Sequence, residues 1–434
     1  MTRTFFRQVC PAMIAFAFSG LYTIVDGFFI GRNLGDVGLA AINLAFPLAA
    51  IVQAVGTGLG MGGAVKLSYH RGRGEPERQR LYLGNTITAL LGCSALAMVV
   101  LWLVSRPLLM LFGAQGAVLD AGVTYLRVIL LGTVFQLCAT GFAPLLRNYD
   151  ASVLAMGAMV AGFVTNIVLD WLFVSVYQWG MAGAAGATII GQAVTVIPCV
   201  WFLFRRVHGL KLSDFRLHGD TVRSIFQIGL SPFGLTVSPF IVIILINKSA
   251  AVYGGDVAVA AYAVISYIVA IVQLLLQGIG DGTQPLMSVY FGRQDRDAIL
   301  FTRKLAFSFA AATAVLCAGA LMLLQPLIAG FFGASPQAAP LIAQSLPIFI
   351  ASFLFTAFCR TATSYFYATQ KNSFAYLMVY GEPILLAVLL AFVFPRLLGL
   401  TGVWLSIPCT QCLLSTLGIL LLLLERRQEK TVSA

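Results

Sequence analysis

Blocks of about twenty apolar residues recur along the whole chain, and charged residues fall only at or near their ends. Residues 86–104 and 376–394 are two clear examples. A helix needs about 20 apolar residues to cross a bilayer, whereas the strands of a membrane β-barrel would alternate apolar and polar residues over segments of about 10. We find no such alternation. The sequence therefore predicts an all-α membrane protein.

The composition agrees with this fold class. Apolar residues make up 59% of the chain and charged residues only 10%, against roughly 25% charged residues in soluble domains. Division of the chain at polar or turn-forming stretches predicts twelve spanning helices. They are expected at 6–30, 38–68, 82–104, 117–143, 152–177, 183–205, 224–252, 258–290, 303–328, 338–368, 374–396 and 400–424. The first of them is too long for the core of a signal peptide, so we expect it to be retained.

The net charge of +11 is concentrated in alternate connections between these helices. One set of connections holds Lys66, Arg71, Arg73, Arg78, Arg80, Arg147, Arg205, Arg206, Lys211, Arg216, Arg223, Arg293, Arg296, Arg303, Lys304 and Lys371. The opposite set holds little beyond Arg32, Arg106 and Arg396. Basic loops stay on the cytoplasmic side of a membrane. The charge therefore predicts a multi-pass protein with both termini in the cytoplasm, and it is explained without nucleic acid.

The chain also repeats itself. When residues 35–73 are shifted by 220 positions onto 255–293, fifteen of thirty-nine positions are identical without a gap. Six helices per repeat give the two halves the same orientation in the membrane, as in several transporters. We therefore predict two pseudo-symmetric six-helix lobes around a central cavity, at 1–205 and 224–424, with a cytoplasmic linker at 206–223 and a cytoplasmic tail at 425–434.

Acidic residues within the predicted spans are few, and each is a functional candidate because a buried charge in a membrane is costly. Asp26 lies in the first predicted helix, and Asp170 lies in the fifth. Asn166 precedes Asp170 by four residues, so the two side chains project from one helix face. Two neighbouring carboxylates do not both ionise readily in a low dielectric. The three residues therefore indicate a site for H+ or Na+, although each Asp could instead cap a broken helix or face water.

The second half has a different set of polar residues. We expect Asp281 and Gln284 to line the central cavity, together with Gln53 and Gln273, which the repeat relates to each other. The shift by 220 residues aligns Asp281 with Met61, so the acidic groups of the halves are not symmetric. Aromatic and apolar walls around a few acids would suit lipophilic organic cations.

Glycine-rich runs at 56–63 and 278–282 interrupt two predicted helices, and they indicate either hinges or close helix packing. They lack the lysine and hydroxyl residue of a phosphate loop. The eight cysteines all lie in apolar blocks, and we interpret them as packing residues. The sequence predicts no cofactor apart from the coupling ion, and no metal except Na+ at Asp26, Asn166 and Asp170 if that ion drives transport.

Together these segments resemble the MATE (multidrug and toxic compound extrusion) family over essentially the whole chain. The resemblance rests on Pro11 and residues 21–32, on Ala40-Ala41 and Phe46-Pro47, on 166–170 and 183–188, and on 282–285. It implies a cation-coupled exporter whose first lobe binds the ion at Asp26, Asn166, Asp170 and Thr188. Some members also carry carboxylates in the seventh and tenth helices, which this chain lacks.

The leading hypothesis is a monomeric antiporter of the bacterial inner membrane that exports drug-like or cationic organic compounds in exchange for H+ or Na+, by alternating access. Membrane lipid is its other expected partner. A lipid-linked oligosaccharide flippase is an alternative, but it would need a cationic cavity for a pyrophosphate. A membrane enzyme is disfavoured because no HExxH or serine nucleophile motif is present and His70, His208 and His218 lie in loops. A channel is disfavoured because two unlike lobes give no ring of identical filter loops.

Overall fold

The computed structural model describes residues 1–207 and 209–433, and this part of the chain is almost entirely helical and contains no strand. His208, in the predicted linker, lies outside the described residues. The α-helices are α1 (Thr2–Gly72), α2 (Pro76–Leu111), α3 (Gly116–Leu131), α4 (Thr133–Asn148), α5 (Ser152–Asp170), α6 (Gly180–Arg206), α7 (Gly219–Arg293), α8 (Arg296–Phe331), α9 (Ala338–Ile350), α10 (Phe353–Ala368), α11 (Asn372–Val388) and α12 (Phe394–Ser433). Two π-helical segments, η1 (Trp171–Val176) and η3 (Leu389–Val393), and one short 3₁₀ helix, η2 (Leu212–Phe215), complete the described structure.

Seven of the described helical stretches are long and apolar enough to cross a membrane, or nine if each of two bent pairs forms one span. Three of these stretches are too long for a single crossing. At 1.5 Å per residue, the 71 residues of α1 would extend about 105 Å. Each long stretch changes direction at one glycine in the left-handed region: Gly35 at φ 61°, Gly255 at φ 64° and Gly399 at φ 57°. The multi-pass helical class is confirmed, and the count of twelve stays a prediction.

Two of the predicted spans are bent. The segment predicted at 117–143 is the pair α3 and α4, which meet at an angle of 59° around Gly132. The segment predicted at 338–368 is the pair α9 and α10, which meet at 44°. Hydropathy could not locate these bends, because the residues on either side are equally apolar.

The backbone repeats with the same period as the sequence. Eight of the thirteen described residues with positive φ form pairs 220 positions apart: Gly35 with Gly255, Gly74 with Gln294, Gly113 with Gly333, and Asp150 with Gln370. The two bent pairs and the two π-helical segments also fall at corresponding places in the two halves. The halves therefore share one helical framework.

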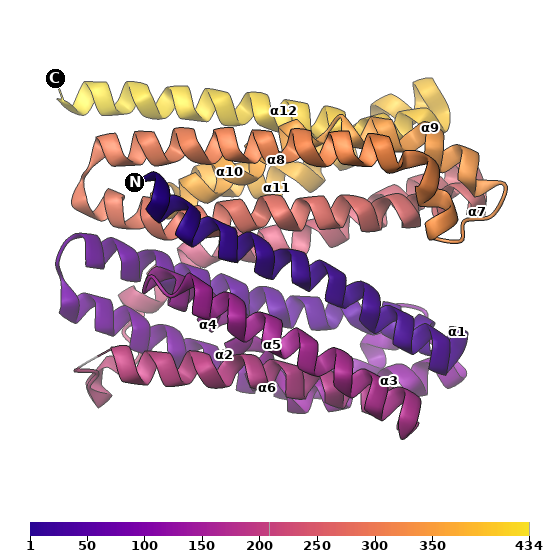
Figure 1. Cartoon of the computed structure of the whole chain (residues 1–434), viewed down its shortest axis with the longest axis horizontal. Coiled ribbons are helices and arrows are strands. Elements are labelled where there is room, and N and C mark those ends of the chain that lie inside the picture. The colour runs from indigo at the N-terminus through magenta and orange to yellow at the C-terminus, as the bar shows by residue number, and fades with distance from the viewer. Residues whose placement is uncertain (208, 434) are drawn as a thin grey trace. The chain divides into compact units, whose positions relative to one another are not determined.

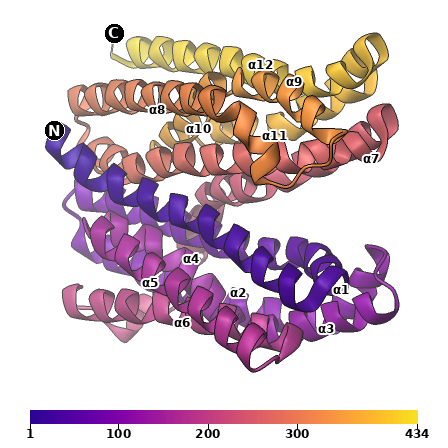
Figure 2. The same ribbon diagram turned by 45° about the vertical axis from the view of Figure 1, so that its right-hand side comes forward.

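By packing, the chain divides into two compact units. Unit 1 contains Met1–Val237 and Gln284–Ile299, and unit 2 contains Ser238–Thr283 and Leu300–Ala434. Unit 1 thus includes two stretches of the second sequence repeat. The domain boundaries predicted at 205 and 224 follow the repeat instead, and they stay a prediction. Figures 1 and 2 show that the first part of α1 runs alongside α5 within unit 1.

The glycine-rich run of α1 serves close packing. A Cβ atom on Gly60 would lie 2.4 Å from the Cα atom of Gly141 on α4, and one on Gly58 would lie 2.8 Å from the carbonyl oxygen of Gly229 on α7. Both glycines lack positive φ values. Of the two expectations for this run, hinge and close packing, the structure supports close packing in unit 1.

Candidate cation-binding site

Three helices of unit 1 bring the predicted site residues together. Asp26 comes from α1, Asn166 and Asp170 come from the last two turns of α5, and Thr188 comes from α6. Asn166 is 2% exposed and Asp170 is completely buried, whereas Asp26 and Thr188 are partly buried. The four residues therefore form a mostly enclosed polar cluster among apolar helices.

The close crossing of α5 and α6 sets the position of two of these residues. A Cβ atom on Gly191 would lie 2.7 Å from the carbonyl oxygen of Gly162 and 2.9 Å from the Cβ atom of Asn166. Only hydrogen atoms fit between the two backbones there. The crossing is about one helical turn from the predicted site, so it fixes how far Asn166 stands from α6.

The amide of Asn166 bridges the two helices. In the orientation that satisfies its hydrogen bonds, its nitrogen donates to Oδ2 of Asp170 at 3.0 Å, and its oxygen accepts from the backbone N–H of Thr188 at 3.0 Å. The hydroxyl of Thr188 donates to the carbonyl oxygen of Ala184 at 3.1 Å. The amide group thus presents a donor, not an oxygen, to the carboxyl group of Asp170.

The two carboxyl groups, on α1 and α5, lie next to each other. Asp26 and Asp170 are within hydrogen-bonding reach of one another. Oδ1 of each is buried and receives no hydrogen bond from the described residues. Two adjacent carboxylates repel each other in a low dielectric, and one proton shared between them or one small cation beside them would remove that repulsion.

Two tyrosines complete the site, and sequence reasoning missed both. Tyr22 on α1 and Tyr125 on α3 lie close to both carboxyl groups and within hydrogen-bonding reach of the Thr188 side chain. Tyr22 stacks on Phe163 of α5 with ring centroids 5.1 Å apart. Tyr22 precedes Asp26 by four residues, so its place on the same helix face could have been found. No spacing in the sequence indicates Tyr125.

The second half carries apolar residues where the first half carries this site. A shift of 220 residues places Ile246 at the position of Asp26, Leu386 at that of Asn166 and Leu390 at that of Asp170. All three are buried. At these three positions the shared framework therefore carries polar side chains in one half and apolar side chains in the other.

The four predicted cavity residues are divided between the two units. Asp281 is buried in unit 2, where its Oδ1 accepts hydrogen bonds from Gln277 at 2.7 Å and from the hydroxyl of Tyr367 at 3.1 Å. Gln273 precedes Asp281 on the same helix, and its side-chain oxygen accepts a hydrogen bond from Arg360 at 3.5 Å. The remaining two residues belong to unit 1.

The two cavity candidates of unit 1 differ in burial. Gln284 is 1% exposed and exchanges hydrogen bonds with the side chain of Asn148, at 2.9 and 3.1 Å. Gln53 has an exposed side chain. Their role in a substrate cavity stays a prediction.

Comparison with known proteins bears on the whole chain. The MatE family model matches twice, at residues 11–172 and 228–393, once in each sequence repeat. "Multidrug export protein MepA" of Staphylococcus saprophyticus is 25% identical over 421 residues, which cover 96% of this chain and 92% of that protein. The protein of the same name from Staphylococcus aureus is 24% identical over 424 residues, with the same coverage.

Solved structures share the fold. A structure described as "Outward-facing conformation of a multidrug resistance MATE family transporter of the MOP superfamily" superposes with a TM-score of 0.91 at 22% identity, over 99% of this chain and 96% of that chain. A MOP superfamily transporter from Pyrococcus furiosus, described as having a binding pocket of reverse polarity, superposes with a TM-score of 0.89 at 23% identity, over 96% of this chain and 94% of that chain.

Proposed function

The chain belongs to the MatE family, and from this premise we propose that it is a secondary active exporter of lipophilic or cationic organic compounds. Similarity to multidrug export proteins along nearly the full length of both chains supports the type of cargo. The long apolar helices support a place in the membrane. We further propose that it is a monomer of the bacterial inner membrane with both termini in the cytoplasm, as the distribution of basic loops predicts.

The observation that carries the coupling proposal is the pair of adjacent carboxyl groups on two different helices. Asp26 belongs to α1 and Asp170 to α5, so ion uptake between them changes the electrostatic interaction between those helices. Removal of the mutual repulsion draws α1 toward α5, and ion release reverses the change. Exchange of the coupling ion is thereby linked to two arrangements of α1, as alternating access requires.

The orientation of Asn166 supports H+ over Na+ as the coupling ion. A sodium ion at the two carboxylates would be expected to take the amide oxygen of Asn166 as a ligand. That oxygen already accepts from the backbone N–H of Thr188, and the amide nitrogen points at Asp170. A proton shared by the carboxyl groups needs no such ligand.

Transport by purified protein in liposomes tests this proposal. Vesicles loaded with ethidium, a lipophilic cation, are given either a proton gradient or a sodium gradient, and dye movement is followed by fluorescence. We expect movement under the proton gradient and at most a small effect of sodium. Sodium-driven movement alone would overturn the proton assignment while leaving the exporter proposal intact.

The flippase alternative predicts a different result in the same vesicles. The protein would then move no ethidium under either gradient, and it would move a lipid carrying a pyrophosphate group between leaflets. Arg360 supports this alternative, because it is a buried cation in unit 2 that contacts Gln273, and a pyrophosphate group would need a cation.

A further inference from the structure

The linker between α6 and α7 is fastened to the side of α2. Asn85 of α2, which is completely buried, donates to the carbonyl oxygens of Asp214 and Arg216 and accepts from the backbone N–H of His218, with distances of 2.9 to 3.0 Å. Gly84 lets the linker approach closely, since a Cβ atom there would lie 2.3 Å from the carbonyl oxygen of Asp214. The linker therefore has a defined position.

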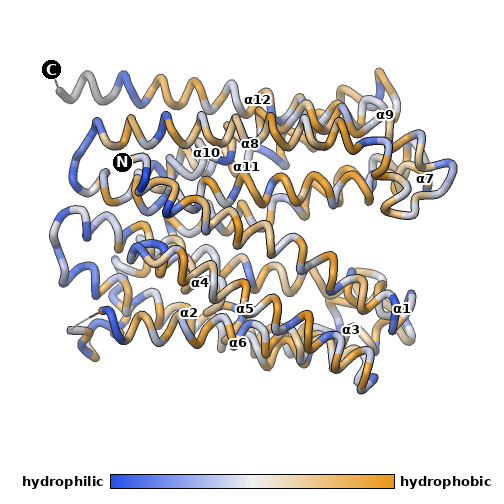
Figure 3. Tube along the Cα trace, viewed as in Figure 1, coloured by the Kyte–Doolittle hydropathy of each residue, from blue (hydrophilic) through white to orange (hydrophobic). Residues whose placement is uncertain are grey.

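That position corresponds to a particular depth in the membrane. The apolar block of α2 begins at residue 86, and the hydroxyl of Thr88, inside this block, donates to the carbonyl oxygen of Phe215 at 2.9 Å. The linker thus lies where the polar end of α2 gives way to its apolar part, which is the level of lipid headgroups. Figure 3 shows that α2 and α6 are largely hydrophobic along the tube.

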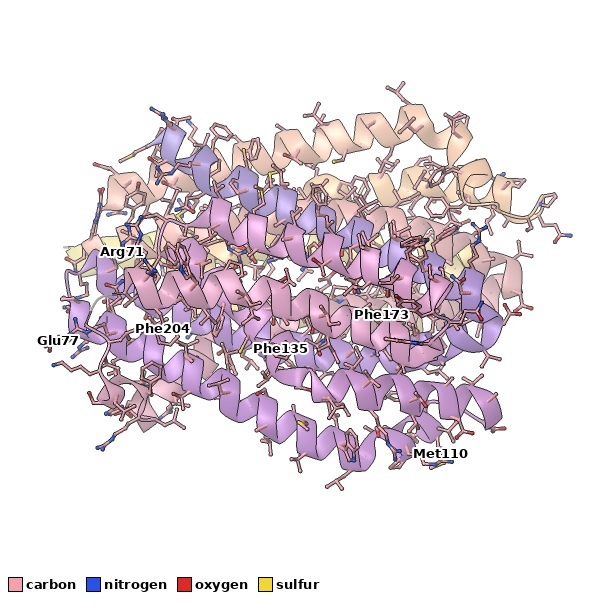
Figure 4. All side chains as sticks on the ribbon, turned by 60° about the horizontal axis from the view of Figure 1, so that its bottom comes forward. Arg71, Glu77, Met110, Phe135, Phe173 and Phe204 are labelled. Carbon is pink, nitrogen blue, oxygen red and sulfur yellow. The ribbon has the colours of Figure 1, made fainter. Side chains whose placement is uncertain are left out.

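Apolar side chains of the linker point outward at this level. Leu212 is 88% exposed and Leu217 is 58% exposed. The adjoining helix ends add exposed Trp201 and Phe204 on α6 and Phe226 on α7. Figure 4 shows Phe204 at the end of unit 1 that also carries Arg71 and Glu77. Leucine and aromatic side chains in this zone bind well to the boundary between headgroups and acyl chains.

Basic side chains accompany these apolar ones. Arg205, Arg206, Lys211 and Arg216 are exposed in the same segment, and Arg223 follows in the second turn of α7. Arg80 of α2 lies beside Gly209. The acidic residues nearby are Asp214, whose carboxylate accepts from the backbone N–H of Lys211 at 2.9 Å, and Asp220. Residues 205–223 thus carry five lysine or arginine and two acidic side chains, apart from their two histidines.

We propose that the described part of the linker, residues 209–218, together with the adjoining ends of α6 and α7, is a binding site for anionic phospholipid headgroups at the cytoplasmic leaflet. Its basic side chains bind the phosphate groups, and Leu212 and Leu217 insert between the upper acyl chains. Juxtamembrane lysine and arginine side chains attract anionic lipid in this way. This site lies outside the carboxyl pair and adds a lipid partner that the export proposal does not require.

Lipid titration of the delipidated full-length protein tests the proposal, with native mass spectrometry as the readout. Phosphatidylglycerol is the anionic probe and phosphatidylethanolamine is the zwitterionic reference. The linker variant carries Arg206→Gln, Lys211→Gln and Arg216→Gln. The control variant carries Arg32→Gln, Arg106→Gln and Arg396→Gln, which removes the same charge from the opposite set of loops.

We expect the natural protein to prefer phosphatidylglycerol, the linker variant to lose that preference by roughly tenfold or more, and the control to change by less than about twofold. A second variant, Leu212→Ser with Leu217→Ser, should bind both lipids more weakly at an unchanged ratio. The proposal is overturned if the linker variant keeps the natural preference, or if the control loses as much. None of these readouts depends on transport, so failure here leaves the export proposal standing.

Discussion

Asp26 and Asp170 show how a single polar pair can be kept among apolar helices. Their carboxyl groups face each other, and Asn166, Thr188 and the two tyrosines supply the surrounding polar atoms. Each carboxyl group keeps one oxygen without a donor in the described part of the chain. Such a pair is well suited to take up and release a small cation, because neither oxygen is committed to a fixed hydrogen bond.

The substitution Asp26→Asn should abolish gradient-driven export. It removes one of the two ionisable groups and with it the repulsion that a coupling ion relieves. The thermal unfolding temperature should stay the same or rise, since one buried charge is lost. Asp36→Asn, an exposed acid just past the break in the same helix, is the control and should export normally. Normal export by Asp26→Asn would contradict the coupling scheme.

Thr188→Val keeps the shape of the side chain but removes the hydroxyl that lies near Tyr22 and Tyr125. Loss of such a hydrogen-bonding group costs about 1 kcal/mol, so we expect export to slow roughly five- to tenfold and stability to fall slightly. Thr188→Ser returns the hydroxyl and should restore most of the rate. Initial rates of dye export for the two variants provide the comparison, and equal slowing in both would show that packing, not the hydroxyl, matters.

At the scale of single residues, the sequence predicts which side chains share a helix face, because the spacing along a helix determines it. The four-residue interval between Asn166 and Asp170 placed both on one face, and the structure shows them in contact. Thr188 followed from family resemblance alone. Tyr125 could not be predicted, because the packing of α3 on its neighbours brings it to the site. No spacing within the sequence of α3 indicates that contact.

Among the helices, the crossing of α5 and α6 depends on two small residues. Gly191→Ala would place a Cβ atom against the carbonyl oxygen of Gly162 and against Asn166, and backbone atoms cannot rotate away. We expect a loss of about 1–3 kcal/mol of stability, together with slower export because Asn166 is displaced. Gly186→Ala, on the same helix with open space around it, should be neutral or slightly stabilising. Thermal unfolding of both variants in detergent tests this pair.

The attachment of the linker to α2 makes a second prediction for the elements. Asn85→Ala removes three hydrogen bonds to the linker, each worth about 0.5–1.5 kcal/mol, so residues 209–218 should become more accessible to protease in membranes that expose this face. Ser94→Ala is the control, because Ser94 is also buried on α2 but donates only to the carbonyl oxygen of Leu91 in its own helix. Equal cleavage of both variants would mean that Asn85 does not hold the linker.

Apolar block length predicted that the described chain would be helical and multi-pass, but it did not predict the form of the connections. Residues 6–30 and 38–68 were expected as separate helices, and α1 contains both, with non-helical φ/ψ angles between them only at Gly35. A glycine at positive φ turns the chain within a helix without a loop. Hydropathy predicts which segments are long enough to cross the membrane. It does not predict whether two such segments are joined by a loop or by a single non-helical glycine.

Across the whole molecule, the two halves share a framework but differ in what they enclose. Leu390→Asp introduces an ionisable group at the second-half counterpart of Asp170, where no tyrosine or threonine of the first-half site has an equivalent. We expect it to lower stability by roughly 2–3 kcal/mol. Asp170→Leu makes the reverse exchange, and it should fold at least as stably as the natural protein while losing coupled export. If Leu390→Asp unfolded at a higher temperature than Asp170→Leu, the proposed difference between the environments of these two positions would be wrong.

The single-glycine breaks make one set of the connections between predicted spans unusually short. Alternate connections of a multi-pass chain emerge on the same face, and Gly35, Gly255 and Gly399 all belong to the set opposite the basic loops. The other members of that set, at 112–115, 177–179 and 332–337, are three to six residues long. In the orientation that we propose, with both termini in the cytoplasm, this set would face the cell exterior and would offer very little chain to an antibody, a phage receptor-binding protein or a host protease. Epitope tags for surface display would have to be inserted in the turns at 112–115, 177–179 or 332–337. A tag at a glycine break would interrupt a continuous stretch of helix.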